Sequence, residues 1–174
     1  QVPSLMMGES TMDASKGYDT VLYRESMGVF AGIVPVNFPA MIPFGWMAPV
    51  CLATGNTMVL KLASMTPMTA MRLNELLYEA GLPKGVVNLV TCSRVEADLF
   101  LKHPDVKAIT FVGSTKVGLH VYKEASATGK RVQALCEAKN HALVLEDAAL
   151  ERSARGIINS SFGCAGERCM ALPV

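Results

Sequence analysis

Residues 108–127 read Ala-Ile-Thr-Phe-Val-Gly-Ser-Thr-Lys-Val-Gly-Leu-His-Val-Tyr-Lys-Glu-Ala-Ser-Ala, and this stretch decides the fold. The apolar run 108–112 is typical of a fully buried strand, and residues 115–127 have the length of a helix. Gly113 and Ser114 stand where the strand meets the helix. A buried strand that leads directly into a helix is the repeating unit of a parallel sheet.

The rest of the chain continues this alternation. We predict strands at 19–25, 28–34, 57–61, 86–90, 132–136 and 142–145, and helices from the Pro35–Pro39 turn to about 53, at 67–80, at 95–102 and at 150–162. Thr66 is the expected N-cap of the helix that Pro67 opens and Gly81 ends. The pattern predicts an α/β fold, a Rossmann-like parallel sheet with helices on both faces. Ligands bind such sheets at the carboxyl ends of the strands.

Composition narrows the class of protein. The chain has 174 residues, which suits one domain with a piece of a second. Its 51% hydrophobic and 18% charged residues indicate a packed core and exclude disorder. A net charge of +1 gives no reason to expect nucleic acid or a membrane surface as a partner. The apolar stretch 27–62 is interrupted by four prolines, so it does not predict a membrane span.

The cysteines and the chain ends add three expectations. The five cysteines form no C-x-x-C pair and the three histidines are scattered, so we expect no metal site and no disulfide framework. This pattern favours a reducing compartment, the cytoplasm or the mitochondrial matrix. The start of the chain does not read as a secretory signal. The chain begins at Gln1 rather than Met and stops at Val174, so we expect a fragment of a longer protein.

A candidate nucleophile lies in the stretch 163–171, Gly-Cys-Ala-Gly-Glu-Arg-Cys-Met-Ala. A cysteine reacts as its thiolate, which a neighbouring cation, backbone N–H groups or a helix terminus favours. Cys169 follows Arg168 in this glycine-rich turn, whereas Cys51 and Cys92 have no such surroundings. The alternative is a buried structural cysteine.

Three more motifs follow predicted strands, each with a plainer alternative. Gly113 and Ser114 open a helix, whose N-terminus favours phosphate, or they form an ordinary helix cap. Lys61 ends a strand, where its side chain can reach the ribose or phosphate of a ligand. Alternatively, it is a solvent-exposed residue at the point where the strand leaves the core. Asn37, between two prolines, can donate to a developing oxyanion, or it serves the turn.

In chain order these four motifs are Pro35–Pro39, Val59–Lys61, Phe111–Thr115 and Gly166–Met170. In that order they resemble the aldehyde dehydrogenase superfamily over nearly the whole chain. The resemblance implies part of the aldehyde dehydrogenase fold, with the nicotinamide-binding domain running up to the nucleophilic cysteine. It divides the chain into an N-terminal strand segment of oligomerisation or linker type (1–26), an NAD-binding domain (27–140) and the start of the catalytic domain (141–174).

Within the superfamily, the chain is most similar to the methylmalonate-semialdehyde dehydrogenase branch. The similarity lies in Val132–Leu135, Ala138–His141, Glu146–Ala148 and Gly166–Ala171. Most aldehyde dehydrogenases have a glutamate, the base that activates water, where this chain has Leu135. The resemblance therefore implies that coenzyme A, rather than water, takes the acyl group. Glu137 is either a displaced base or a local departure from the glycine of the pattern.

The resemblance also implies a mechanism and its residues. Cys169 attacks the aldehyde, and the Asn37 side chain and the Cys169 N–H stabilise the oxyanion. Hydride passes to NAD, the acyl group loses carbon dioxide, and coenzyme A leaves as propionyl- or acetyl-CoA, as in valine catabolism. Arg168 corresponds to the arginine that binds the substrate carboxylate, although it could instead favour the thiolate or form a structural pair.

The resemblance also implies a cofactor site. Its residues would be Val34, Val36, Lys61, Ser64, Met65, Gly113, Ser114 and Cys136. Ser64 and Met65 replace a glutamate and an arginine of the pattern, so NADP is not excluded as the cofactor.

Two alternative functions remain open. One is a hydrolytic aldehyde dehydrogenase that acts without coenzyme A and uses Glu137 or another base. The other is an inactive nucleotide-binding fragment, which the substitutions at Ser64, Met65 and Glu137 favour. We expect the isolated 174 residues to be inactive and the parent enzyme to be a homodimer or homotetramer.

Overall fold

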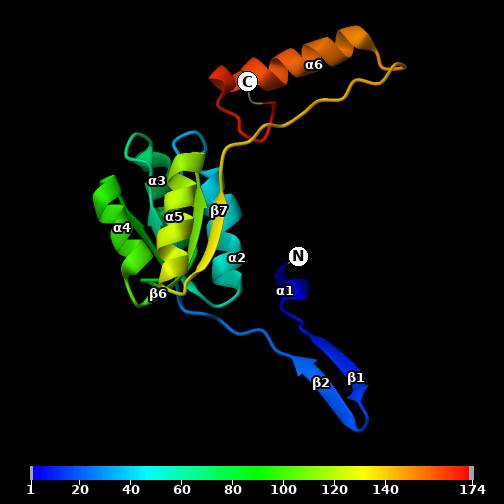
Figure 1. Ribbon diagram of the computed structural model, residues 1–174. Coiled ribbons are helices and arrows are strands. Elements are labelled where there is room, and N and C mark those ends of the chain that lie inside the picture. The colour runs from blue at the N-terminus through cyan, green and yellow to red at the C-terminus, as the bar shows by residue number, and fades with distance from the viewer. Residues whose placement is uncertain (1, 173–174) are drawn as a thin grey trace.

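The computed structural model of the chain describes residues 2–172 and has a parallel sheet at its centre (Figure 1). In chain order, the elements are α1 (Val2–Leu5), β1 (Glu9–Ser15), β2 (Tyr18–Leu22), β3 (Val29–Ile33), the π-helix η1 (Ile42–Met47), α2 (Ala48–Ala53), β4 (Thr57–Lys61), α3 (Pro67–Glu79), β5 (Val87–Val90), α4 (Arg94–Lys102), β6 (Val106–Val112), α5 (Thr115–Ala127), β7 (Arg131–Leu135), α6 (Leu150–Phe162) and the 3-10 turn η2 (Gly163–Gly166).

The central sheet has five parallel strands in the order β5-β4-β3-β6-β7. Within this sheet the first strand along the chain is β3, and β4 and β5 follow on one side of it. The chain then crosses to the other side of β3 and forms β6 and β7. The strand order therefore reverses between β3 and β6. In open α/β sheets the crevice outside the carboxyl ends of the strands at such a point is where ligands bind.

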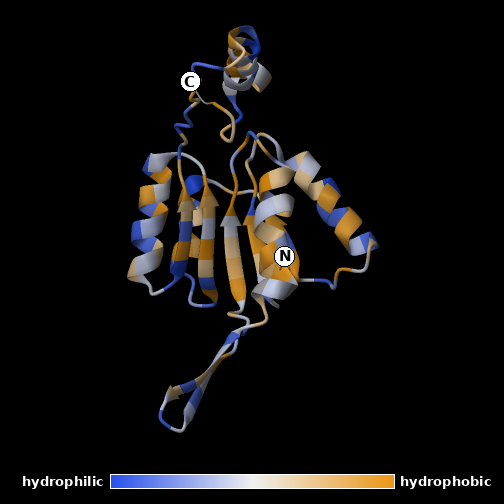
Figure 2. Ribbon diagram, turned by 90° about the vertical axis from the view of Figure 1, so that its right-hand side faces the viewer, coloured by the Kyte–Doolittle hydropathy of each residue, from blue (hydrophilic) through white to orange (hydrophobic). Residues whose placement is uncertain are grey.

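Helices cover both faces of the sheet, as predicted (Figures 1 and 2). One face packs against η1, α2 and α3 around the fully buried side chains of Ile42, Met58 and Leu60. The other packs against α4 and α5 around Leu101, Ile109 and Phe111. Burial of each large side chain stabilises the fold by about 1.5–3 kcal/mol. These two cores fix the positions of the strand ends, and with them the crevice.

The predicted elements between residues 28 and 136 are all present, with ends shifted by a few residues. The predicted strand 142–145 is wrong. Residues 141–147 are exposed and have no regular structure, because no strand among the described residues lies beside them to supply hydrogen bonds. The predicted strand 19–25 is shorter than expected. It pairs in antiparallel fashion with β1, a strand that the sequence pattern did not predict.

Two local features differ from simple helix expectations. The helix after the Pro35–Pro39 turn begins as a π-helix, in which the Ala48 N–H bonds to the Pro43 oxygen, five residues back. Thr66 occupies the N-cap position before Pro67, but its hydroxyl makes no cap bond. It donates to the Val36 oxygen at 3.2 Å instead, and so ties the start of α3 to the loop after β3.

Two segments, one near each end of the chain, project from opposite ends of the sheet strands. The β1–β2 hairpin extends from the amino ends of the strands, and α6 lies beyond their carboxyl ends (Figure 1). The hairpin is exposed along its length, and α6 exposes Leu150, Ile158 and Phe162. The division at 26 and 140 remains a prediction. Residue 1 of the first predicted segment and residues 173–174 of the last lie outside the residues that the structure describes. None of the described helices has the length and apolar character to cross a membrane.

Candidate active site

A cavity of about 330 Å³ lies at the carboxyl edge of the sheet, where the strand order reverses. Four segments that are distant in sequence line it, and we call it the switch-point pocket. The lining residues are Pro35 and Asn37 after β3, Val112, Gly113 and Ser114 at the end of β6, Cys136, Glu137, Ala138 and Lys139 after β7, and Gly166, Glu167 and Cys169 after η2. The structure thus brings five predicted site residues together: Asn37, Gly113, Ser114, Cys136 and Cys169.

Asn37 connects the first of these segments to the last. Its side-chain nitrogen Nδ2 donates a hydrogen bond of 2.6 Å to the backbone oxygen of Glu167, two residues before Cys169. An amide NH₂ group has two hydrogens, and this bond uses one of them. The other is available to an acceptor in the pocket, as an oxyanion-stabilising role requires.

Cys169 is half-buried in a turn that several hydrogen bonds hold in place. Asn140 donates from Nδ2 to the backbone oxygens of Cys169, at 3.0 Å, and of Ala171. The Ala171 N–H bonds to the Arg168 oxygen. By contrast, burial raises the pKa of the Cys51 thiol to about 11, so that cysteine is a core residue and a poor nucleophile. No group of three or more His, Cys, Asp or Glu side chains within residues 2–172 could hold a metal ion.

The backbone before Cys169 is bent through a left-handed turn. Cys164, Ala165 and Gly166 have φ angles of 56°, 54° and 74°. This region is costly for residues with a Cβ atom, and such strain is concentrated at functional sites. The turn reverses the chain after α6 and brings Cys169 back to the pocket.

Arg168 lies outside the lining of the switch-point pocket. Its guanidinium donates from Nε to the Gly163 oxygen at 3.3 Å and from Nη2 to the Asn159 oxygen, near the C-terminal end of α6. A Cβ atom on Gly163 would lie 1.7 Å from Nη2, so only glycine leaves room for this contact. The helix dipole favours a cation at this end. Arg168 is thus bonded to two backbone oxygens, and its proposed contact with the substrate carboxylate stays a prediction.

The start of α5 has the features of a phosphate site. Ser114 is the N-cap residue, but its side chain makes no cap hydrogen bond. The N–H groups of the first helical turn are not bonded within the helix, and they lie at the positive end of the helix dipole. These features fit the pyrophosphate of a dinucleotide at Gly113 and Ser114.

The other predicted cofactor residues lie along the same edge of the sheet but do not line the pocket. Lys61 ends β4, beside β3, and its oxygen accepts a hydrogen bond from the Val34 N–H at 3.2 Å. Val34 is buried, which fits a contact through its backbone, whereas Val36 is 42% exposed. Ser64 and Met65 lie in the exposed turn before α3, and the Met65 side chain is 84% exposed.

Sequence reasoning did not assign a site role to several residues that line the pocket. Pro35, Val112, Ala138, Lys139, Gly166 and Glu167 all belong to motifs that had been recognised. Their contribution depends on the turns that follow the strands, which strand and helix patterns do not predict. For Glu137, the sequence left open a displaced base and a local departure from the family pattern. In the structure its carboxylate accepts a hydrogen bond from the Thr115 hydroxyl at 3.1 Å.

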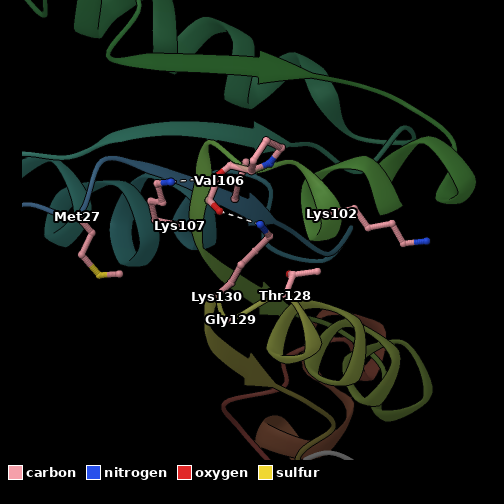
Figure 3. Close-up of a pocket in the computed structure, with 8 residues that line it drawn as sticks. Met27, Lys102, Val106, Lys107, Thr128, Gly129 and Lys130 are labelled. Carbon is pink, nitrogen blue, oxygen red and sulfur yellow. Dashed lines mark hydrogen bonds between the residues drawn. The ribbon is translucent and has the colours of Figure 1, made fainter.

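A larger cavity, of about 560 Å³, lies at the opposite edge of the sheet and lacks candidate catalytic groups (Figure 3). Lys130 is 9% exposed there and donates to the backbone oxygens of His103 and Val106. Lys107 donates to the Pro104 oxygen, and Lys102 points away from both. Burial, and then the charge of Lys107, lowers the pKa of Lys130. Backbone oxygens therefore engage two of these lysines, and we interpret this edge as structural.

Comparison with known sequences identifies the family of the chain. A sequence model of the aldehyde dehydrogenase family matches residues 2–174. The malonate-semialdehyde dehydrogenase 1 of Oceanobacillus iheyensis is 51% identical over 172 residues, and the malonate-semialdehyde dehydrogenase 2 of Geobacillus kaustophilus is 55% identical over 172 residues. Each match covers 99% of this chain but 35% of the relative. These relatives are bacterial and give no support to the mitochondrial alternative.

Solved structures give the same result. The methylmalonate-semialdehyde dehydrogenase of Oceanimonas doudoroffii is 44% identical, with a TM-score of 0.90, and the match covers 98% of this chain and 35% of that one. A Sinorhizobium meliloti protein assigned to the same activity, and complexed with NAD, is 43% identical with a TM-score of 0.90 over the same shares of the two chains.

Proposed function

We propose that this chain, which belongs to the aldehyde dehydrogenase family, carries the nucleophile, the oxyanion donor and much of the NAD site of a coenzyme A-acylating semialdehyde dehydrogenase. The chain spans about a third of the length of the relatives it matches (35%), so the activity proposed is that of the whole protein. Its substrates would be methylmalonate or malonate semialdehyde, as the names of the relatives suggest.

One observation carries the proposal. Cys169 and Asn37 line one pocket with Gly113 and Ser114, which open α5. A nucleophile, an oxyanion donor and a phosphate-binding helix start are what oxidation of an aldehyde by a dinucleotide requires in one place. The position of the pocket at the reversal of strand order supports the same assignment.

The residues of the chain would act in the following order. The Cys169 thiolate adds to the aldehyde carbon, and the carbonyl electron pair moves to oxygen. Asn37 Nδ2 and the Cys169 backbone N–H donate to this oxyanion. NAD, when bound, would supply the hydride acceptor for oxidation of the adduct to a thioester. The left-handed turn holds Cys169 at the pocket throughout.

Coenzyme A would take the acyl group. Leu135, at the end of β7, cannot accept a proton from water, so a thiol is the better acceptor for the thioester. Before that transfer, the bond between the α-carbon and the carboxylate would break, carbon dioxide would leave, and a proton would take its place on the α-carbon. The overall reaction converts methylmalonate semialdehyde, NAD⁺ and coenzyme A to propionyl-CoA, carbon dioxide and NADH. Arg168 would bind the substrate carboxylate with the guanidinium hydrogens that its two backbone bonds leave over.

Hydrolysis is the second candidate function, and one observation favours it. Glu137 lines the same pocket as Cys169, so a carboxylate lies near the proposed thioester. Against this role, Thr115 at the start of α5 holds the Glu137 carboxylate. We therefore favour coenzyme A as the acceptor.

Trapping of the acyl-enzyme tests the proposal. We would mix the full-length protein with NAD and methylmalonate semialdehyde, without coenzyme A, and map the acyl adduct by peptide mass spectrometry. We expect a propionyl group on Cys169 and its release when coenzyme A is added. Cys164→Ser, a change at the exposed neighbouring thiol, is the matched control and should still be acylated. Acylation at another cysteine, or none in the presence of NADH formation, would disprove the assignment.

A further inference from the structure

The carboxylate of Glu137 lies at the start of α5, where the proposed function places the pyrophosphate of the cofactor. Glu137 follows β7 by two residues and lines the switch-point pocket with Gly113 and Ser114. Its Oε2 accepts the Thr115 hydroxyl at 3.1 Å, and Thr115 is the first residue of α5. The hydrogen bond therefore holds a negative charge beside the first turn of the helix.

The first turn of α5 attracts an anion, and the Ser114 side chain does not accept a hydrogen bond from its free N–H groups. The Ser114 side chain makes no cap bond, and its backbone oxygen accepts the Gly118 N–H at 2.9 Å. A helix start without a side-chain cap presents N–H donors and a partial positive charge. A carboxylate at this position gains from the same field that would bind a phosphate, so the two groups compete for it.

The charges of the pocket add to this competition. Its charged lining residues are Glu137, Lys139 and Glu167, which gives a net charge of −1. Without the Glu137 carboxylate, the positive charge of Lys139 and the negative charge of Glu167 would cancel. A pyrophosphate entering the pocket therefore meets net repulsion that comes from Glu137.

We infer that Glu137 competes with the cofactor phosphates for the N-terminus of α5 and so weakens dinucleotide binding. This inference rests on the proposed function, because it assumes that the pocket binds a dinucleotide. Loading of the site requires the Glu137 side chain to leave Thr115. Removal of the charge strengthens binding of ligands that carry phosphate and leaves a nucleoside without phosphate unaffected.

Calorimetric titration of the full-length protein tests the inference. We would compare the wild type, Glu137→Gln and Glu137→Ala, titrated with NAD, and with adenosine in competition against NAD. Glu25→Gln is the matched control, because it removes the same charge from an exposed side chain at the amino edge of the sheet. Two unit charges about 4 Å apart in water interact by about 1 kcal/mol, so NAD should bind about fivefold more tightly to both Glu137 variants.

The outcomes separate the inference from the proposed function. A tighter NAD complex in the Glu137 variants, unchanged adenosine binding and an unchanged Glu25→Gln protein support the inference. The gain should also shrink in high salt, because ions screen an exposed carboxylate. Equal NAD affinity in all proteins overturns the inference and leaves the nucleotide site intact. An equal gain in adenosine affinity in the Glu137 variants has the same meaning. Failure of the wild type and every variant to bind NAD overturns the nucleotide site itself, and the inference with it.

Discussion

The Asn37 side chain and the Glu167 backbone are joined by a 2.6 Å hydrogen bond across 130 residues of sequence. The donor follows β3, in the middle of the sheet, and the acceptor lies two residues before Cys169. This bond ties the loop that carries the proposed oxyanion donor to the turn that carries the proposed nucleophile. The two roles assigned to Asn37, donor to a reaction intermediate and tie to the turn, therefore belong to one amide group.

Replacement of Asn37 should affect catalysis more than cofactor binding. In Asn37→Ala the oxyanion loses a donor, and we expect kcat to fall by about 10²–10³-fold while the affinity for NAD changes little. Steady-state kinetics and calorimetry of the full-length protein measure the two effects. Asn88→Ala, which removes an exposed amide bonded to the Gly85 oxygen, is the matched control and should keep full activity. A proportional loss of NAD affinity in Asn37→Ala would mean that the residue is only structural.

Arg168 allows a test of substrate choice. If its remaining guanidinium hydrogens bind the substrate carboxylate, Arg168→Lys should raise KM for methylmalonate semialdehyde by about tenfold, because lysine lacks the forked geometry. The KM for propanal, which has no carboxylate, should change far less. Equal losses for both aldehydes would indicate that Arg168 acts only through its bonds to the Asn159 and Gly163 oxygens.

Lys130 should stabilise the fold without contributing to the site. Its ammonium donates to the His103 and Val106 oxygens at 2.7 and 2.9 Å. Lys130→Met leaves these oxygens without a donor, and we expect a loss of about 1–3 kcal/mol in the free energy of unfolding. Urea denaturation measures this loss. Lys107→Met, at an exposed lysine with one backbone bond, should cost less than about 0.5 kcal/mol. Equal losses would contradict the role given to Lys130.

The Cys51 thiol should make stability depend on pH in the alkaline range. Burial raises its pKa from 9.0 to about 11, so the folded state keeps the thiol protonated where the unfolded chain ionises. The contribution is complete below pH 9 and is lost between pH 9 and about 11. It amounts to about 2–3 kcal/mol by linkage. Urea unfolding of the wild type and Cys51→Ala at pH 8 and pH 11 isolates it, since the variant lacks this part of the pH dependence. Parallel pH profiles would show that Cys51 does not titrate in this way.

Much of the fold could be predicted from local sequence. Strand β6 is an apolar run that is buried on both faces, and α5 follows it at once, so their pattern identified a parallel α/β sheet. Strand β1 was missed because Glu9–Ser15 is exposed throughout and lacks the apolar alternation that marks a strand. The predicted strand 142–145 failed for the opposite reason. Its residues are apolar, but a strand also needs an adjacent strand for its hydrogen bonds, and local sequence does not indicate whether one is present.

The candidate site was predicted in part for similar reasons. Asn37 and Cys169 were recognised from their motifs, and sheet topology brings them to one edge. The contact between Glu137 and Thr115 depends on the path of the chain after β7, which follows no periodic pattern. The backbone bonds of Arg168 depend on the left-handed turn at Cys164 and Ala165, residues that rarely adopt such angles.

Turnover with and without coenzyme A tests the central claim most directly. The full-length protein would be assayed with NAD and methylmalonate semialdehyde, beside Cys169→Ala and the Cys164→Ser control. We predict sustained NADH formation only when coenzyme A is present, none in Cys169→Ala and normal turnover in Cys164→Ser. Equal turnover without coenzyme A would contradict the acylating function and indicate that a base such as Glu137 activates water.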